Sequence, residues 1–154
     1  MATLYSNQKT KWSQNVPSEK IDTNEQAGKM RIAFADVTLA SAAISDVVQM
    51  VNLPNGARII DGYLTNAALG ASTTLSVGYA AHKNAAGTTV ALSATAYLAA
   101  TSTSSAARTD IFATQALGAN SVVDANEDGL PITITLAGGT ASGVVQIAIR
   151  YVVD

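Results

Sequence analysis

The chain has 154 residues, one histidine, no cysteine and a formal net charge of −2. Without cysteine it can form neither disulfides nor thiolate metal sites, and one histidine excludes a cage of several imidazoles. Charged residues make up 13% of the chain, about half the usual share of about 25%, so no strong field favours nucleic acid or a membrane surface.

The first 28 residues have the composition of an extended arm. They are rich in Asn, Gln, Lys, Ser and Thr, show no sustained period of 2 or 3.6, contain Pro17 and end at Gly28. We therefore expect two parts, an extended polar N-terminal arm over 1–28 and a folded domain over 29–154. The first residues lack the apolar stretch of a secretory signal, and no segment has 18 consecutive apolar residues, so we expect assembly in a cytoplasm.

Two large aromatic side chains, Tyr5 and Trp12, stand in this polar setting beside Lys9 and Lys11. They fit aromatic anchors that insert into a neighbouring protein, although they could instead fold back onto their own domain. The first 31 positions hold five basic and three acidic residues, whereas the remainder holds four basic and eight acidic ones. This asymmetry favours contacts between the arm of one copy and the body of another.

The folded part is predicted to be a series of short strands. Alternating apolar and polar residues, or β-branched runs bounded by turn residues, predict seven of them. Pro54-Asn55-Gly56 is a strong turn signal, and Gly62 indicates a bulge or a close backbone approach. The expected strands are 29–39, 46–53, 57–66, 73–81, 109–115, 130–136 and 144–153.

The segment between these strands, residues 82–123, is ambiguous. Thr88–Ala100 fits either a short helix or a further strand, and the small polar residues 101–105 predict a surface loop. The many short strands indicate an all-β protein built as a single β-sandwich, and a jelly-roll-like order is the variant favoured.

No catalytic constellation is present. His82 would have to serve any Ser-His-Asp triad, yet no G-x-S-x-G elbow occurs, and its setting predicts an exposed turn residue. The three glutamates, Glu19, Glu25 and Glu127, fall in the arm or a turn, so no pair of carboxylates is evident for glycoside hydrolysis. The glycine-rich segments lack the residues of a phosphate loop. We therefore expect no enzymatic activity and no cofactor.

One motif resembles the start of a calcium loop. Asp124, Asn126 and Asp128 supply oxygens at alternate positions before Gly129. However, Thr135 takes the twelfth position, where a bidentate glutamate belongs, and Asp, Asn and Gly are also what an ordinary turn requires. A plain acidic turn is the preferred interpretation. Nucleic-acid stacking on Lys9, Lys11 and Trp12 is disfavoured by the acidic residues that follow.

Several stretches resemble a known group of proteins. MATLYSN at the start, GKMRIAFADVTL after the arm, LPNGARIIDGYL in the middle and IAIRYVVD near the end are similar to small virion proteins of tailed bacteriophages. The resemblance is to head decoration, or cement, proteins, especially those of phages that infect cyanobacteria and marine bacteria.

The resemblance implies a structural protein of the virion that binds the phage major capsid protein at the capsid surface and braces the joints between its subunits. It also implies a homo-oligomer, with a trimer favoured over a dimer, and neither a nucleic-acid nor a membrane partner. An alternative with the same β-domain is a head-fibre or tail-associated protein that binds a host receptor or glycan through loops such as Thr101–Arg108.

Overall fold

The computed structural model describes residues 28–113 and 122–153. Within these ranges the chain forms ten strands and no helix, so none of the described residues belongs to a helix that could cross a membrane. The strands are β1 (Met30–Ala42), β2 (Val47–Leu53), β3 (Arg58–Asn66), β4 (Thr74–Tyr79), β5 (His82–Lys83), β6 (Thr89–Val90), β7 (Ser93–Ser102), β8 (Ala107–Asp110), β9 (Leu130–Ala137) and β10 (Ala141–Val152).

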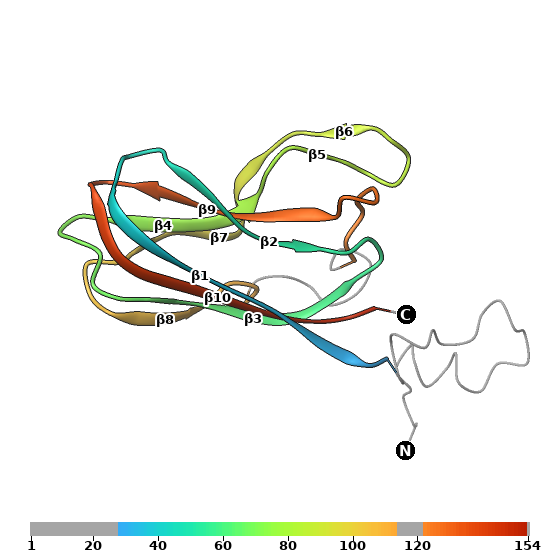
Figure 1. The fold of residues 1–154 in the computed structure, drawn as a ribbon, viewed down its shortest axis with the longest axis horizontal. Helices are drawn as coiled ribbons and strands as arrows, with labels where there is room; N and C mark the ends of the chain where they lie inside the picture. The colour runs from blue at the N-terminus through green and yellow to red at the C-terminus, as the bar shows by residue number, and fades with distance from the viewer. Residues whose placement is uncertain (1–27, 114–121, 154) are drawn as a thin grey trace, which may run out of the picture.

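Eight of these strands form two four-stranded sheets packed face to face. The first sheet, called sheet A here, has the order β1-β10-β3-β8, and sheet B has the order β2-β9-β4-β7. All neighbouring strands are antiparallel, and the layers lie one above the other in Figure 1. Two four-stranded sheets with this order form a jelly roll. The predicted β-sandwich is therefore confirmed.

The core lies between the two sheets and follows the period of 2 in the sequence. Alternate residues of β10, Val145, Ile147 and Ile149, are completely buried, as are Ile132 and Ile134 of β9. Each such side chain stabilises the fold by about 1.5–3 kcal/mol relative to its exposed state. β9 and β10, the two strands with the most regular alternation in the sequence, therefore supply the centre of the core.

In the ambiguous middle segment, the described residues form strands joined by turns and loops. Thr88–Ala100 contains β6 and most of β7, not a helix, and β7 pairs with β4. The loop predicted over 101–105 is partly wrong, because β7 continues to Ser102. The strand predicted over 109–115 is shifted: β8 ends at Asp110, and positions 114 and 115 lie outside the described residues.

Two local features behave as the residue types require. The amide of Ala57 donates to the carbonyl of Pro54 at 3.2 Å, and Gly56 has φ of 74°, so the predicted turn is confirmed. A Cβ atom on Gly62 would lie 2.9 Å from the carbonyl oxygen of Ala148. The close backbone approach expected at Gly62 is therefore present.

Strand β4 differs from the half-buried strand that its alternation predicts. Leu75 and Val77 are buried, but Ser76 and Gly78 on the opposite face are buried as well. A Cβ atom on Gly78 would lie 1.8 Å from the carbonyl oxygen of Ser93. The backbone of β7 thus covers this side of β4, which only a residue without a side chain permits.

Candidate interaction surface

Strand β1 presents an apolar row to solvent. Met30, Ile32 and Phe34 are 54%, 65% and 59% exposed, while the neighbouring Ala33 and Ala35 pack against the core. Because side chains alternate along a strand, the large residues face outward and the small ones inward. Exposed apolar side chains grouped in this way mark surfaces that other molecules cover. These three residues are called the β1 row below.

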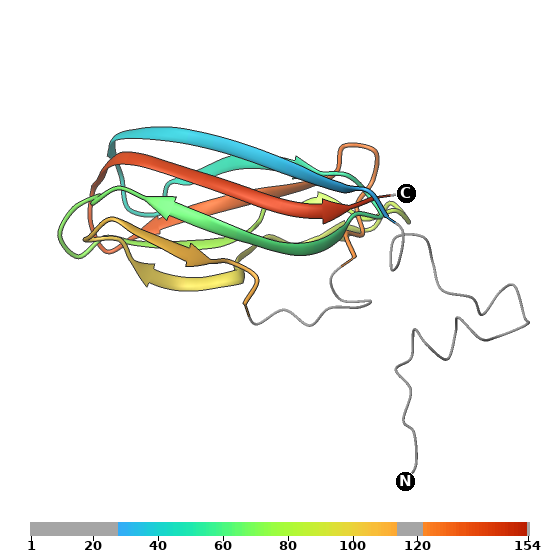
Figure 2. The same ribbon diagram turned by 90° about the horizontal axis from the view of Figure 1, so that it is seen from below.

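The β1 row lies on an edge strand. β1 is 13 residues long and pairs with β10 on one side only, at the end of sheet A. Within the described part of the chain, no strand pairs with its other edge. Long unpaired edges invite pairing with another chain unless they are protected. Figure 2 looks onto sheet A and shows β1, in blue, along its border.

Charged residues flank the β1 row at both ends. Lys29 precedes it, Arg31 stands within it and Asp36 follows it. Lys29 and Arg31 also account for the basic excess of the first 31 positions, because residues 1–27 hold three basic and three acidic residues. The charge expected on the arm therefore lies at the beginning of β1.

The outer face of sheet A continues beyond β1 as a set of charged contacts. Arg150 of β10 donates two hydrogen bonds to the carboxylate of Asp61 on β3. Hydrogen bonding to Asp61, and next the negative charge of Asp61, raise the pKa of Arg150. The side chains of Arg150 and Asp61 are 44% and 45% exposed, so the pair adds little to stability, although it fixes the position of both side chains.

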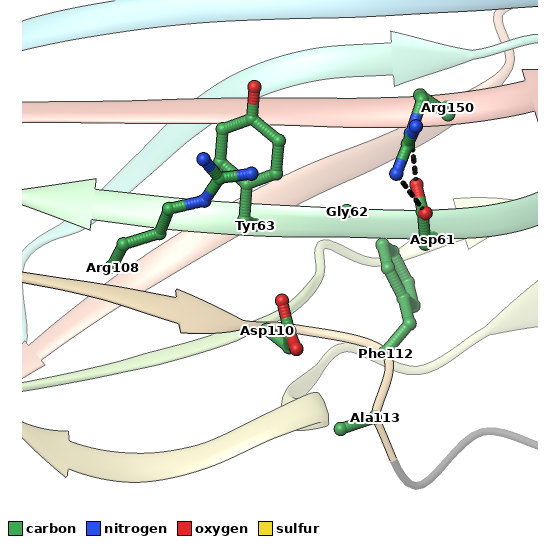
Figure 3. Close-up of a pocket in the computed structure, with 8 residues that line it drawn as sticks. All are labelled: Asp61, Gly62, Tyr63, Arg108, Asp110, Phe112, Ala113 and Arg150. Atoms are coloured by element: carbon green, nitrogen blue, oxygen red, sulfur yellow. Dashed lines mark hydrogen bonds and ion pairs between the residues drawn. The ribbon is translucent and has the colours of Figure 1, made fainter.

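Next to this pair lies a hollow of about 300 Å³. The guanidinium of Arg108 lies 3.6 Å from the centre of the Tyr63 ring, a cation–π contact. Figure 3 shows Arg108 and Tyr63 on one side of the hollow, Asp61 and Arg150 on the other, and Asp110 between them. Among the described residues that line it, the charged side chains are two carboxylates and two guanidiniums, which together carry no net charge that would attract an ion.

The sequence setting of His82 predicted an exposed turn residue, but the structure places this histidine in a strand. It begins β5, is half-buried, and its ring lies edge-on to Tyr79 with centroids 5.3 Å apart. Its Nδ1 lies 3.1 Å from the carbonyl oxygen of Ala80. The preceding strand β4 delivers Tyr79 to the histidine, which is why the ring packs and does not extend into solvent.

The residues of the possible calcium loop form the turn before β9. The amide of Ala85 donates to Asp124 Oδ1 at 2.9 Å, and Asn126 Nδ2 donates to Asp128 Oδ2 at 2.8 Å. The carboxylates therefore already accept hydrogen bonds within the protein. In the described part of the chain no three His, Cys, Asp or Glu side chains gather as a metal site would require.

The four predicted partner-binding residues, Tyr5, Lys9, Lys11 and Trp12, lie outside the described residues. The β1 row was not predicted as a surface, because Met30, Ile32 and Phe34 read as one apolar face of a strand. The signal was present in the alternating alanines, Ala33 and Ala35. The contacts of Asp61 with Arg150 and of Tyr63 with Arg108 join residues far apart in sequence and leave no local pattern.

The fold is shared with chains of known virus structures. No protein-family model matches the sequence, and no curated protein matches it either. A chain in the capsid of Ralstonia phage GP4 superposes with a TM-score of 0.61 at 20% identity, covering 83% of this chain and 86% of the other. A chain in the capsid asymmetric unit of cyanophage Pam1 gives 0.56 at 21%, covering 82% and 86%.

A chain in the acid-stable capsid of Helicobacter pylori bacteriophage KHP30 gives a TM-score of 0.48 at 15% identity, covering 80% and 87%. The GP4 and Pam1 chains establish the fold of the present protein as one that occurs in phage capsid structures.

Proposed function

We propose that this protein is a non-enzymatic structural protein of a phage virion, which decorates the capsid and stabilises it through contacts with the major capsid protein. The observation that carries the proposal is the β1 row on an edge strand whose outer side no other described strand pairs with, in a fold also found in two phage capsid structures. Burying three large apolar side chains in an interface contributes several kcal/mol before the cost of association.

Repetition explains how a small contact can hold the protein on a shell. A capsid offers many copies of each binding site, and linked copies of a decoration protein bind several sites at once. Multivalent binding of this kind exceeds the affinity of any single contact. A homo-oligomer, with a trimer favoured over a dimer, therefore belongs to the proposal, and its mass in native mass spectrometry tests that part.

The test of the interface is a binding experiment with phage heads that lack the protein. Purified wild-type protein is mixed with heads and pelleted, in parallel with the double variant Ile32→Ser/Phe34→Ser. A matched control is Leu92→Ser, because Leu92 is exposed to 66% but lies outside β1. We expect the wild type and the control to pellet with heads and the double variant to remain in solution.

The outcomes separate the parts of the proposal. Equal pelleting of all three proteins would remove the β1 row as the interface while leaving decoration intact. Failure of the wild type itself to pellet would contradict decoration. Thermal melting of each variant shows that it is folded, and since Ile32 and Phe34 are exposed, we expect melting temperatures within a few degrees of the wild type.

The alternative role is a head-fibre or tail-associated β-domain that binds a host receptor or glycan. The same fold serves both roles, so location separates them. Protein found by mass spectrometry in purified tails, and absent from purified heads, would favour the alternative.

A further inference from the structure

Carboxamide side chains gather at one end of the sandwich. The described part of the chain contains seven Asn and Gln residues, and five of them line two adjoining hollows there. The other two, Asn66 and Gln146, lie elsewhere. The five are Gln49, Asn52, Asn55, Asn84 and Asn126, and they are called the carboxamide patch below.

The patch is assembled from segments far apart in sequence. The amide of Asn126 donates to the carbonyl of Lys83 at 2.8 Å, which joins the turn before β9 to the β5–β6 hairpin. Both segments lie at the same end of the molecule in Figure 1. The hollows measure about 420 Å³ and about 500 Å³ and share Lys83, Asn126 and Asp128. Ligand sites commonly have volumes of about 300–1,000 Å³.

Two carboxamides of the patch, those of Asn55 and Asn84, are anchored through their oxygen atoms, whereas the Nδ2 groups of Asn52 and Asn126 already donate to Asp128. Asn55 Oδ1 accepts from the amide of Ala125 at 3.3 Å, and Asn84 Oδ1 accepts from the amide of Thr88 at 2.8 Å. Neither Nδ2 group donates to another described residue. The fold therefore fixes the orientation of both side chains and leaves both Nδ2 groups without an acceptor among the described residues. A side chain that is already oriented lowers the entropic cost of binding.

The chemistry of the patch fits a neutral ligand rich in hydroxyl groups. A carboxamide offers two donors and an acceptor, and a sugar hydroxyl both donates and accepts. Ala81 and Pro131 line the first hollow and supply an apolar surface for the C–H face of a sugar ring. Among the described residues that line the two hollows, Lys83 is the one Lys or Arg, and it stands against Asp128 and Glu127. An anionic ligand is therefore disfavoured.

We propose that the carboxamide patch binds a neutral oligosaccharide, with Asn55 and Asn84 donating hydrogen bonds to its hydroxyl groups. This activity is independent of capsid binding through β1, which lies on the other sheet. It also differs in place from the loop Thr101–Arg108 that the sequence offered for a glycan.

The test uses the full-length protein on an array of neutral and acidic oligosaccharides, followed by calorimetric titration with the strongest neutral ligand found. Asn55→Asp and Asn84→Asp keep the acceptor oxygen that anchors each side chain and remove the Nδ2 donor. Gln146→Glu makes the same change of group and charge on sheet A and serves as the control. We expect each patch variant to bind about tenfold more weakly, and the control to bind like the wild type.

Three results would overturn the proposal. They are no binding to any neutral oligosaccharide at millimolar concentration, equal weakening in Gln146→Glu, and a rise in melting temperature with Ca²⁺ in the absence of any glycan binding. The last would identify the turn at Asp124, Asn126 and Asp128 as a cation site instead. Pelleting of Asn55→Asp with phage heads keeps this test separate, because we expect that variant to decorate normally.

Discussion

Two glycines, Gly62 and Gly78, stand where a neighbouring segment comes too close for a side chain. A Cβ atom would lie 2.9 Å from the Ala148 carbonyl at Gly62, but 1.8 Å from the Ser93 carbonyl at Gly78. Overpacking costs about 1–3 kcal/mol, and more where backbone must move. We expect Gly62→Ala to cost about 1–3 kcal/mol and Gly78→Ala more, measured by denaturant unfolding. Equal costs would show that β7 does not rest on β4 as described.

Tyr97 makes the unfolding free energy of the protein depend on pH in the alkaline range. Burial, and to a smaller extent Tyr79, raise the pKa of Tyr97 to about 12, and its ring packs against Phe112 with centroids 4.8 Å apart. The folded state retains the proton more strongly, so the stabilisation is complete below the unfolded pKa of about 10 and is lost as the pH rises through the folded value. We expect unfolding free energy to fall by about 2 kcal/mol over this range.

The variant Tyr97→Phe separates this residue from the other tyrosines. It keeps the ring and removes the ionisable hydroxyl, so the fall in unfolding free energy between about pH 10 and about pH 12 should become smaller. An unchanged pH profile in this variant would assign the effect to another group.

At the scale of the element, β1 combines a core-facing and a solvent-facing side. Leu39 points inward and is 6% exposed, whereas Ile32 on the same strand is 65% exposed. We expect Leu39→Ala to lower the unfolding free energy by about 2–4 kcal/mol and Ile32→Ala by less than about 0.5 kcal/mol. Similar losses in chemical denaturation would mean that the outward side of β1 is covered within the monomer.

The elements also show what the sequence can and cannot predict. β9 and β10 were predictable as strands, because alternation around Ile132 or Ile147 places the large apolar side chains on the core face. The burial of the other face of β9, where Thr133 is 2% exposed, was not predictable from that alternation. β7 was not predictable, because its alanines fit a helix as well as a strand. It is a strand because it pairs with β4. The outward side of β1 was hidden for a related reason: Ile32 and Phe34 are the residues a core would use, and only the packing of Ala33 and Ala35 reveals the opposite orientation.

For the whole molecule, two surfaces are proposed for two different tasks. The β1 row and the outer face of sheet A offer contacts to protein, and the carboxamide patch offers hydrogen bonds at the end of the sandwich near the β5–β6 hairpin. The strand order of the jelly roll separates them, since β1 and β2 pass to different sheets. A variant at either surface should therefore leave the other intact.

The N-terminal arm gives a further prediction at this scale. The described fold begins with β1 at Met30, so removal of residues 2–28 should leave a folded sandwich. If Tyr5 and Trp12 anchor the protein to its neighbours, the truncated protein should melt cooperatively but pellet less with heads. Pelleting equal to that of the full chain would assign attachment to the sandwich alone.

The central claim is that this sandwich is a capsid-bound structural protein whose β1 edge faces another protein. Cryo-electron microscopy of virions of the phage that encodes it tests this claim most directly. We predict an eight-stranded sandwich on the outside of the shell, at repeated positions, with Ile32 and Phe34 buried against a neighbouring protein. Shells that carry no such density, or a sandwich whose β1 edge faces solvent, would contradict the account.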